Sequence, residues 1–147
     1  ELGVVSEGVG YTLPFEVAAA PWIDPTAFAA ALNARSIPGV WFRAMHCQPF
    51  YGKFAKERIG GVQIHLTDRR RVPLTAIQFH LMDVVRTQHT DQKLFGGKRD
   101  GMFDKVCGTD QVRQMFQAGK PLRDILALWD ADVEAFRLAS EKYLLYH

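Results

Sequence analysis

The sequence predicts an α+β domain in which helices pack on a small mixed β-sheet. Alternating apolar and polar residues, the period of a strand, occur in the first half of the chain. Apolar residues at helical spacing dominate the second half. Runs of strands followed by runs of helices are typical of this class. At 147 residues the chain is long enough for a single domain that buries a core without disulfides or a metal.

Composition argues against several classes of partner. Hydrophobic residues make up 48% and charged residues 23% of the chain, as in ordinary soluble domains. The formal net charge of +2 is too small to indicate nucleic acid or an anionic membrane. No apolar run approaches the roughly 18 residues of a spanning helix, so no membrane insertion is expected. Cys47 and Cys107 fit no metal or redox spacing and are expected to be small buried residues.

The first predicted elements flank two glycines. Short apolar runs predict strands over residues 2–5 and 15–20, and Gly8 and Gly10 lie in the loop between them. Glycine allows positive φ or a close approach of the backbone to a ligand. We therefore expect something to lie against this loop.

A helix and two longer strands follow. Asp24 is suited to cap a helix that begins at Pro25 and ends near Ser36. Residues 40–47 and 61–68 alternate, which predicts strands with one apolar and one mixed face. The apolar faces are expected to hold Val40, Phe42, Ala44, His46, Val62, Ile64 and Leu66, and the mixed faces Trp41, Arg43, Met45, Cys47, Gln63, His65 and Thr67.

Helical spacing of apolar residues is the main pattern after the strands. Leu74, Ile77, Leu81 and Val84 predict one amphipathic helix. In order, the expected elements are a helix from Pro73 to about His89, a glycine-rich loop over residues 91–101, one helical turn over residues 103–107, a helix capped by Thr109 that runs through Ala118, and a long helix from Leu122 to about Lys142.

Patterns of metal, nucleophile and phosphate sites are absent. His46 and His65 belong by alternation to opposite kinds of face, and no His-x-x-x-His spacing occurs, so neither a metal nor another cofactor is expected. No Gly-x-Ser-x-Gly motif occurs. Gly8-Val9-Gly10 lacks the third glycine of a dinucleotide fingerprint.

A set of aromatic and polar residues remains in the loops and on the mixed strand faces. Aromatic rings offer flat surfaces for sugars, while amides, imidazoles and guanidinium groups bind hydroxyl, amide and carboxylate groups. Two alternatives stay open: Trp22 and Trp41 as core residues, and Gln63 and His65 facing a helix or solvent. The set comprises Glu7, Tyr11, Trp22, Trp41, Arg43, Tyr51, Lys53, Gln63 and His65.

Several segments, taken in order, resemble a known family. They are SEGVGYTLPFE, AAPWID, GGVQIHLTD, GTDQVRQMFQAGK and FRLASEKYLLY. Together they resemble the C-terminal domain of the NamZ-type exo-β-N-acetylmuramidases, which are peptidoglycan-degrading glycoside hydrolases. The resemblance extends over residues 1–146.

The resemblance implies a larger parent protein, and Glu1 indeed begins what looks like the middle of a strand. A Rossmann-like N-terminal domain would precede this chain, and the active cleft would lie where the two domains meet. The expected partners are that domain and a muramic-acid-containing glycan. The family also implies an extracytoplasmic location. The residues expected to bind substrate are Glu7, Gly8, Gly10, Tyr11, Arg43, Lys53, Gln63 and His65.

Two features restrict what the resemblance implies. Glycoside hydrolysis needs two carboxyl groups, and only Glu1, Glu7 and Glu16 lie near the expected cleft, so the catalytic pair is not assigned. The common family form Gly-Arg-Gly-Thr is Gly8-Val9-Gly10-Tyr11 here, so an arginine contact to an anionic group is lost or supplied by Arg43 or Lys53.

Two other classes of function are alternatives. One is a non-catalytic glycan-binding or structural accessory domain. The other is an isolated metal-dependent hydrolase, which would contain bound zinc. For the muramidase interpretation, the 147-residue chain by itself is expected to be inactive.

Overall fold

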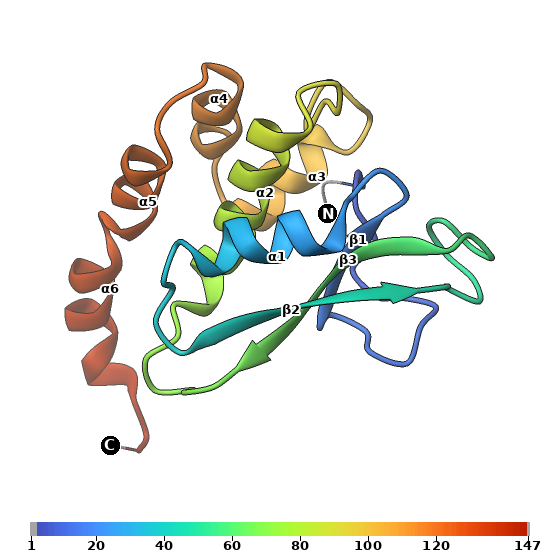
Figure 1. Ribbon diagram of the computed structural model, residues 1–147. Helices are drawn as coiled ribbons and strands as arrows, with labels where there is room; N and C mark the ends of the chain where they lie inside the picture. Colours follow the sequence, from blue (N-terminus) through green and yellow to red (C-terminus); the bar gives the residue numbers. More distant parts are fainter. Residues whose placement is uncertain (1–2, 147) are drawn as a thin grey trace. The chain divides into compact units, whose positions relative to one another are not determined.

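A computed structural model describes residues 3–146 and divides the chain into two compact units. The first unit extends to Arg99 and the second begins at Asp100. The first unit contains all the strands and the second contains helices (Figure 1). The predicted α+β class, with strands in the first half and helices in the second, is confirmed.

Three strands form the sheet: β1 (Val17–Ala20), β2 (Val40–Cys47) and β3 (Ile59–Leu66). Their order is β1-β3-β2 and both pairings are antiparallel. The sheet is therefore antiparallel throughout, whereas the sequence analysis expected a mixed sheet. The central strand is the last of the three in the chain, a pairing that no local pattern specifies.

The strand boundaries follow the predictions unevenly. Strand β2 has the predicted bounds, and β3 lies two positions earlier than predicted at each end. Strand β1 begins at Val17 because Phe15 has a left-handed φ of 65°. The described part of the predicted strand at residues 2–5 is not a strand. The chain instead makes one bridge a residue later, where Ser6 and Ala19 exchange backbone hydrogen bonds of 2.7 and 3.0 Å.

Cross-strand pairing divides the sheet into two faces. The helix face holds Ala18, Ala20, Val40, Phe42, Ala44, His46, Gly60, Val62, Ile64 and Leu66. The opposite face, named here the loop face, holds Val17, Ala19, Trp41, Arg43, Met45, Cys47, Ile59, Gly61, Gln63 and His65. This division agrees with the alternation of residues 40–47 and 61–66.

Helix α1 (Pro25–Asn33) covers the helix face, and α2 (Ile77–Gln88), which follows the short η1 (Leu74–Ala76), packs on α1 (Figure 1). The Asp24 carboxylate accepts a 2.8 Å bond from the Ala27 N–H, so the predicted cap is confirmed. The helix ends at Asn33, before Ser36 with its φ of 51°. The fully buried core here includes Phe28, Leu32, Phe42, Val62 and Phe79.

The side chain of Asn33 covers part of the free edge of β2. Its Nδ2 donates to the Phe42 carbonyl at 2.8 Å, and its Oδ1 accepts from the Phe42 N–H at 2.9 Å. An edge strand otherwise offers such groups to other chains. Asn33 thus joins α1 to the sheet through the backbone of the strand.

A buried carboxylate connects α1 and α2. Asp83 is 7% exposed and forms ion pairs with Arg35 at 2.6 Å and with Arg86 at 2.5 Å. Two partners compensate for the cost of removing this charge from water. His80, one turn earlier on α2, is half-buried beside them, and its pKa is lowered by burial and then by Arg35, with Asp83 acting in the opposite direction.

Loops cover one end of the loop face. Buried Val17, Ala19, Cys47 and Ile59 form a cluster there. The side chains packed on the cluster are Tyr11, Leu13, Met45 and Phe54. Burial raises the pKa of the Cys47 thiol. This end of the face is therefore core, and Tyr11 belongs to it.

The two glycines of the N-terminal loop have left-handed backbones because other backbone segments lie against them. Both have φ of +85°. A Cβ at Gly8 would overlap the carbonyl oxygen of Leu13, and one at Gly10 would overlap that of Tyr51. The Phe50 N–H also donates to the Gly10 carbonyl at 2.6 Å. Segments of the chain itself thus occupy the places beside these glycines.

The second unit consists of four α-helices and a short η2 (Glu141–Tyr143) among the described residues. Helix α3 (Asp100–Cys107) is longer than the single turn predicted, and α4 (Gln111–Gln117) starts after Asp110 rather than directly after Thr109. The predicted long helix is two helices, α5 (Leu122–Asp130) and α6 (Val133–Ser140). Asp132 occupies the N-cap position of α6, without a side-chain hydrogen bond to the helix, and aspartate favours such a position over a helix interior.

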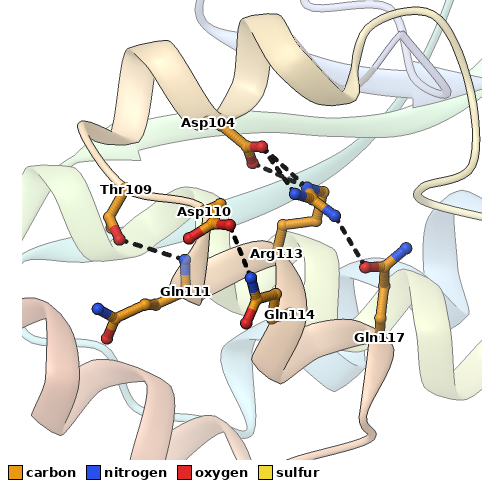
Figure 2. A network of polar contacts seen from close by, with 7 residues as sticks. All are labelled: Asp104, Thr109, Asp110, Gln111, Arg113, Gln114 and Gln117. Carbon is orange, nitrogen blue, oxygen red and sulfur yellow. Dashed lines mark hydrogen bonds and ion pairs between the residues drawn. The ribbon is translucent and has the colours of Figure 1, made fainter.

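Polar contacts join α3 to α4 (Figure 2). The Arg113 guanidinium makes a two-pronged contact with Asp104 at 2.8–3.1 Å and donates to the Gln117 amide oxygen at 3.1 Å. Bidentate pairs of this kind are stronger than single contacts. Thr109 accepts from the Gln111 N–H at 3.2 Å, so its hydroxyl does contact the start of α4.

We predict that Gly10→Ala strongly destabilises the protein. The new Cβ would overlap the Tyr51 carbonyl in addition to the roughly 1–2 kcal/mol cost of left-handed φ. Gly119→Ala is the matched control, since Gly119 has φ of +67° and no atom within 4 Å of its Cβ position. Urea unfolding followed by circular dichroism should show a loss for Gly10→Ala at least about twice that of the control. Equal losses would contradict the packing argument.

Because the pKa of His80 is lowered in the folded protein, we expect the free energy of unfolding to decrease in mild acid. Its folded pKa is below the ordinary value of 6.5, so the unfolded chain binds more protons as the pH drops through 6.5 and unfolding is favoured. The slope contributed is at most about 1.4 kcal/mol per pH unit. His80→Gln should flatten the change in unfolding free energy between pH 7 and 5, and the exposed His46→Gln is the control. A profile identical to that of the unmodified protein would refute this role.

Candidate functional site

The other half of the loop face is open and carries the polar residues of the sheet. Trp41 lies opposite His65 across β2 and β3, and Arg43 lies opposite Gln63. Neighbouring pairs on one face bring all four side chains to the same surface. Three of the predicted site residues, Arg43, Gln63 and His65, are therefore grouped by the fold.

A chain of hydrogen bonds, named here the polar row, links Arg43, Gln63 and Glu16. Arg43 Nη2 donates to Gln63 Oε1 at 2.7 Å, and Gln63 Nε2 donates to Glu16 Oε2 at 3.3 Å. The guanidinium thus fixes the orientation of the amide, because only its oxygen can accept. The carbonyl of Glu16 also accepts from the Ile64 N–H at 2.8 Å, which holds the residue at the sheet.

The polar row contains one buried side chain between two exposed ones. Gln63 is only 8% exposed, whereas Arg43 and Glu16 are exposed. The buried amide therefore connects a cation and a carboxylate that both meet solvent. Each retains capacity for further hydrogen bonds, since a guanidinium has five donors and a carboxylate about four acceptor sites.

Trp41 and His65 lie beside the polar row. Trp41 is 56% exposed, so it is not a core residue. His65 is half-buried, and its Nε2 is buried without a hydrogen-bond partner among residues 3–146. A flat aromatic surface next to hydrogen-bonding groups is an arrangement suited to sugars. Trp22 differs, since its ring packs against His89 with centroids 4.7 Å apart.

A groove of about 360 Å³ opens at the β1 edge of the sheet. Its walls are mainly apolar, with Glu7 and Glu16 as the acidic groups and Gln78 as an amide. Glu16 therefore belongs to both the groove and the polar row. The lining residues are Val5, Glu7, Phe15, Glu16, Val17, Ala18, Ile64, Leu66, Leu74, Ile77, Gln78 and Leu81.

Glu16 is the residue of this surface that the candidate list omitted. The sequence indicated Glu16 only as a carboxyl group near the expected cleft, because its contact with Gln63 depends on pairing between segments distant in the sequence. Glu7 lines the groove, whereas Gly8 and Gly10 contact backbone of the chain itself. Tyr11 packs on the covered end of the loop face.

The two cations considered as substitutes for the arginine at Val9 have different surroundings. Arg43 belongs to the polar row. The Lys53 ammonium lies 4.5 Å from the centre of the Phe54 ring, a cation–π contact on the loop between β2 and β3. Arg43 is thus the cation placed on the open sheet surface.

No metal-ligand cluster of three His, Cys, Asp or Glu side chains exists among residues 3–146. His46 and His65 lie on opposite faces of the sheet, as the alternation indicated. Cys47 and Cys107 are free thiols, the first buried and the second half-buried. Within the described part of the chain, no helix has the length and apolar character needed to cross a membrane.

Comparisons with known proteins agree on one family. Residues 1–146 match the family described as "Exo-beta-N-acetylmuramidase NamZ, C-terminal". The chain is 30% identical over 142 residues to "Peptidoglycan beta-N-acetylmuramidase NamZ" of Bacillus subtilis (strain 168), an alignment that covers 97% of this chain and 34% of the relative.

A solved structure has the same fold. A DUF1343 family protein from Bacteroides fragilis matches with a TM-score of 0.95 and 40% identity, over 99% of this chain and 39% of that one. The chain thus spans about a third of the length of its relatives. The match of nearly the whole sequence shows that the chain belongs to the family of NamZ C-terminal domains.

Proposed function

We propose that this chain forms one wall of the cleft in which a peptidoglycan exo-β-N-acetylmuramidase binds the terminal, non-reducing N-acetylmuramic acid. The polar row beside exposed Trp41 is the observation on which this proposal rests. The Bacillus subtilis relative is named a peptidoglycan β-N-acetylmuramidase, which supports the substrate class.

The chemistry of the surface suits this sugar. The indole of Trp41 offers a flat face for the C–H groups of the ring. Arg43 offers a guanidinium for the lactyl carboxylate of muramic acid, and Glu16 accepts from hydroxyl or amide N–H groups. The buried amide of Gln63 holds both at a fixed spacing.

The reaction is assigned to the whole parent protein. Glycosidases use two carboxyl groups across the scissile bond, one as acid and one as nucleophile or base. Glu7 and Glu16 lie in one groove, but the chain corresponds to only 34% of the relative. We place the catalytic pair, at least in part, on the upstream portion of the parent.

Because the substrate is a cell-wall polymer, the proposed place of action is extracytoplasmic.

A non-catalytic glycan-binding domain is the second candidate, and exposed Trp41 favours it equally. The two differ in their parent: an accessory domain would belong to a protein without muramidase activity. Titration of the chain with muramic-acid oligosaccharides measures binding, and hydrolysis by the parent decides between the two.

The proposal assigns hydrolysis to the parent protein and not to this chain alone. Full-length parent protein should release nitrophenol from a nitrophenyl β-N-acetylmuramide, and the 147-residue chain should not, because hydrolysis needs two carboxyl groups and the proposal places at least one of them on the upstream portion of the parent. Release of nitrophenol is followed by absorbance. Full activity of the chain alone would place the catalytic groups within these residues.

Trp41 is expected to contribute to substrate binding. In the full-length parent, Trp41→Ala should raise KM for the same substrate about tenfold, equivalent to about 1.4 kcal/mol of lost binding. Phe136→Ala is the control, since Phe136 is also an exposed aromatic residue but belongs to α6 of the second unit. An unchanged KM would remove Trp41 from the substrate surface.

A further inference from the structure

The loop that joins β2 to β3, residues 48–58, presents two aromatic side chains to solvent. Phe50 is 82% exposed and Tyr51 is 62% exposed. Phe54 of the same loop instead packs on the buried cluster of the loop face. In Figure 1 the loop extends beyond the paired ends of the two strands. Contiguous exposed apolar side chains can mark a binding surface.

The loop has a defined shape rather than a free one. Gly52, Phe54 and Lys56 all have left-handed φ, of 82°, 59° and 67°. Non-glycine residues adopt this conformation at a cost of roughly 1–2 kcal/mol each, so the surrounding contacts must hold it.

Hydrogen bonds supply those contacts. The Lys56 N–H donates to the Pro49 carbonyl at 2.7 Å, and the Lys56 carbonyl accepts from Gln48 Nε2 at 2.7 Å. The Phe50 N–H donates to the Gly10 carbonyl at 2.6 Å, which joins the loop to the N-terminal glycines. Phe50 and Tyr51 are thus exposed on a preformed support, which lowers the entropic cost of binding.

The charge of the loop is positive. Lys53, Lys56 and Arg58 are exposed, and Glu57 is the only acidic residue between positions 48 and 58. Within residues 3–146, none of the three cations is in an ion pair. Exposed cations without an ion-pair partner, beside aromatic faces, are complementary to a glycan that carries carboxylates.

From these observations we infer that residues 48–58 form a second glycan contact, which binds an anionic, muramic-acid-containing strand beyond its terminal sugar. Phe50 and Tyr51 stack on sugar rings, and Lys53, Lys56 and Arg58 attract the carboxylates. The inference deepens the proposed function, on which it rests, by assigning the polymeric part of the substrate to a surface distinct from the polar row.

Binding to the 147-residue chain tests the inference. The probes are soluble peptide-free peptidoglycan strands, chitin oligosaccharides, which lack carboxylates, and polyglutamate, which lacks sugars. Calorimetry should show binding of the peptidoglycan strands that weakens several-fold from 50 to 300 mM salt. Phe50→Ala/Tyr51→Ala should weaken it at least about tenfold, and Lys53→Gln/Lys56→Gln several-fold.

Matched controls are available outside the β2–β3 loop. Phe136 and Tyr143 are 73% and 74% exposed, so Phe136→Ala/Tyr143→Ala removes equivalent aromatics. Lys98→Gln/Lys105→Gln removes two other exposed cations. No binding of peptidoglycan strands, equal loss in the controls, or equal affinity for polyglutamate or for chitin oligosaccharides would each overturn the inference.

A measurement on the full-length parent separates this inference from the proposed function. Phe50→Ala/Tyr51→Ala should slow digestion of long glycan strands while hydrolysis of the small nitrophenyl substrate stays unchanged. Failure of the parent to cleave either substrate refutes the proposed function. Cleavage of both at unchanged rates by the variant refutes only the second glycan contact.

Discussion

Backbone contact between the N-terminal loop and the β2–β3 loop is the constraint on which the rest of this surface depends. Gly10 lies so close to the Tyr51 carbonyl that no side chain fits, and its own carbonyl accepts the Phe50 N–H. The contact holds two loops over one end of the loop face, where Tyr11, Leu13 and Phe54 complete the core. The other end stays open, and the polar residues of β2 and β3 are exposed there.

The same contact connects the two proposed glycan surfaces. The segment that includes Gly10 continues to Glu16, which belongs to the polar row, and the Tyr51 segment belongs to the aromatic and cationic loop. One rigid arrangement can therefore hold a terminal sugar and the strand that follows it at a fixed spacing.

The glycines illustrate how a correct local observation leads to an incomplete explanation. The sequence required something to lie against Gly8 and Gly10, and something does: the backbone at Leu13 and Tyr51. A ligand was the expected neighbour, because the sequence offers no means to recognise a backbone segment 41 positions away as the partner. Glu7 of the same loop instead lines the groove.

Local patterns in the sequence determined the α+β class, the Asp24 cap of α1, the bounds of β2 and the alternation that placed Arg43, Gln63 and His65 on one kind of face. These follow from periodicity and short-range hydrogen bonds. Only the tertiary structure decided that β3 lies between β1 and β2, that Gln63 bonds to both Arg43 and Glu16, and that Trp41 is exposed while Trp22 packs on His89. Such contacts join residues far apart in the chain, and their free energy depends on packing that no local pattern encodes.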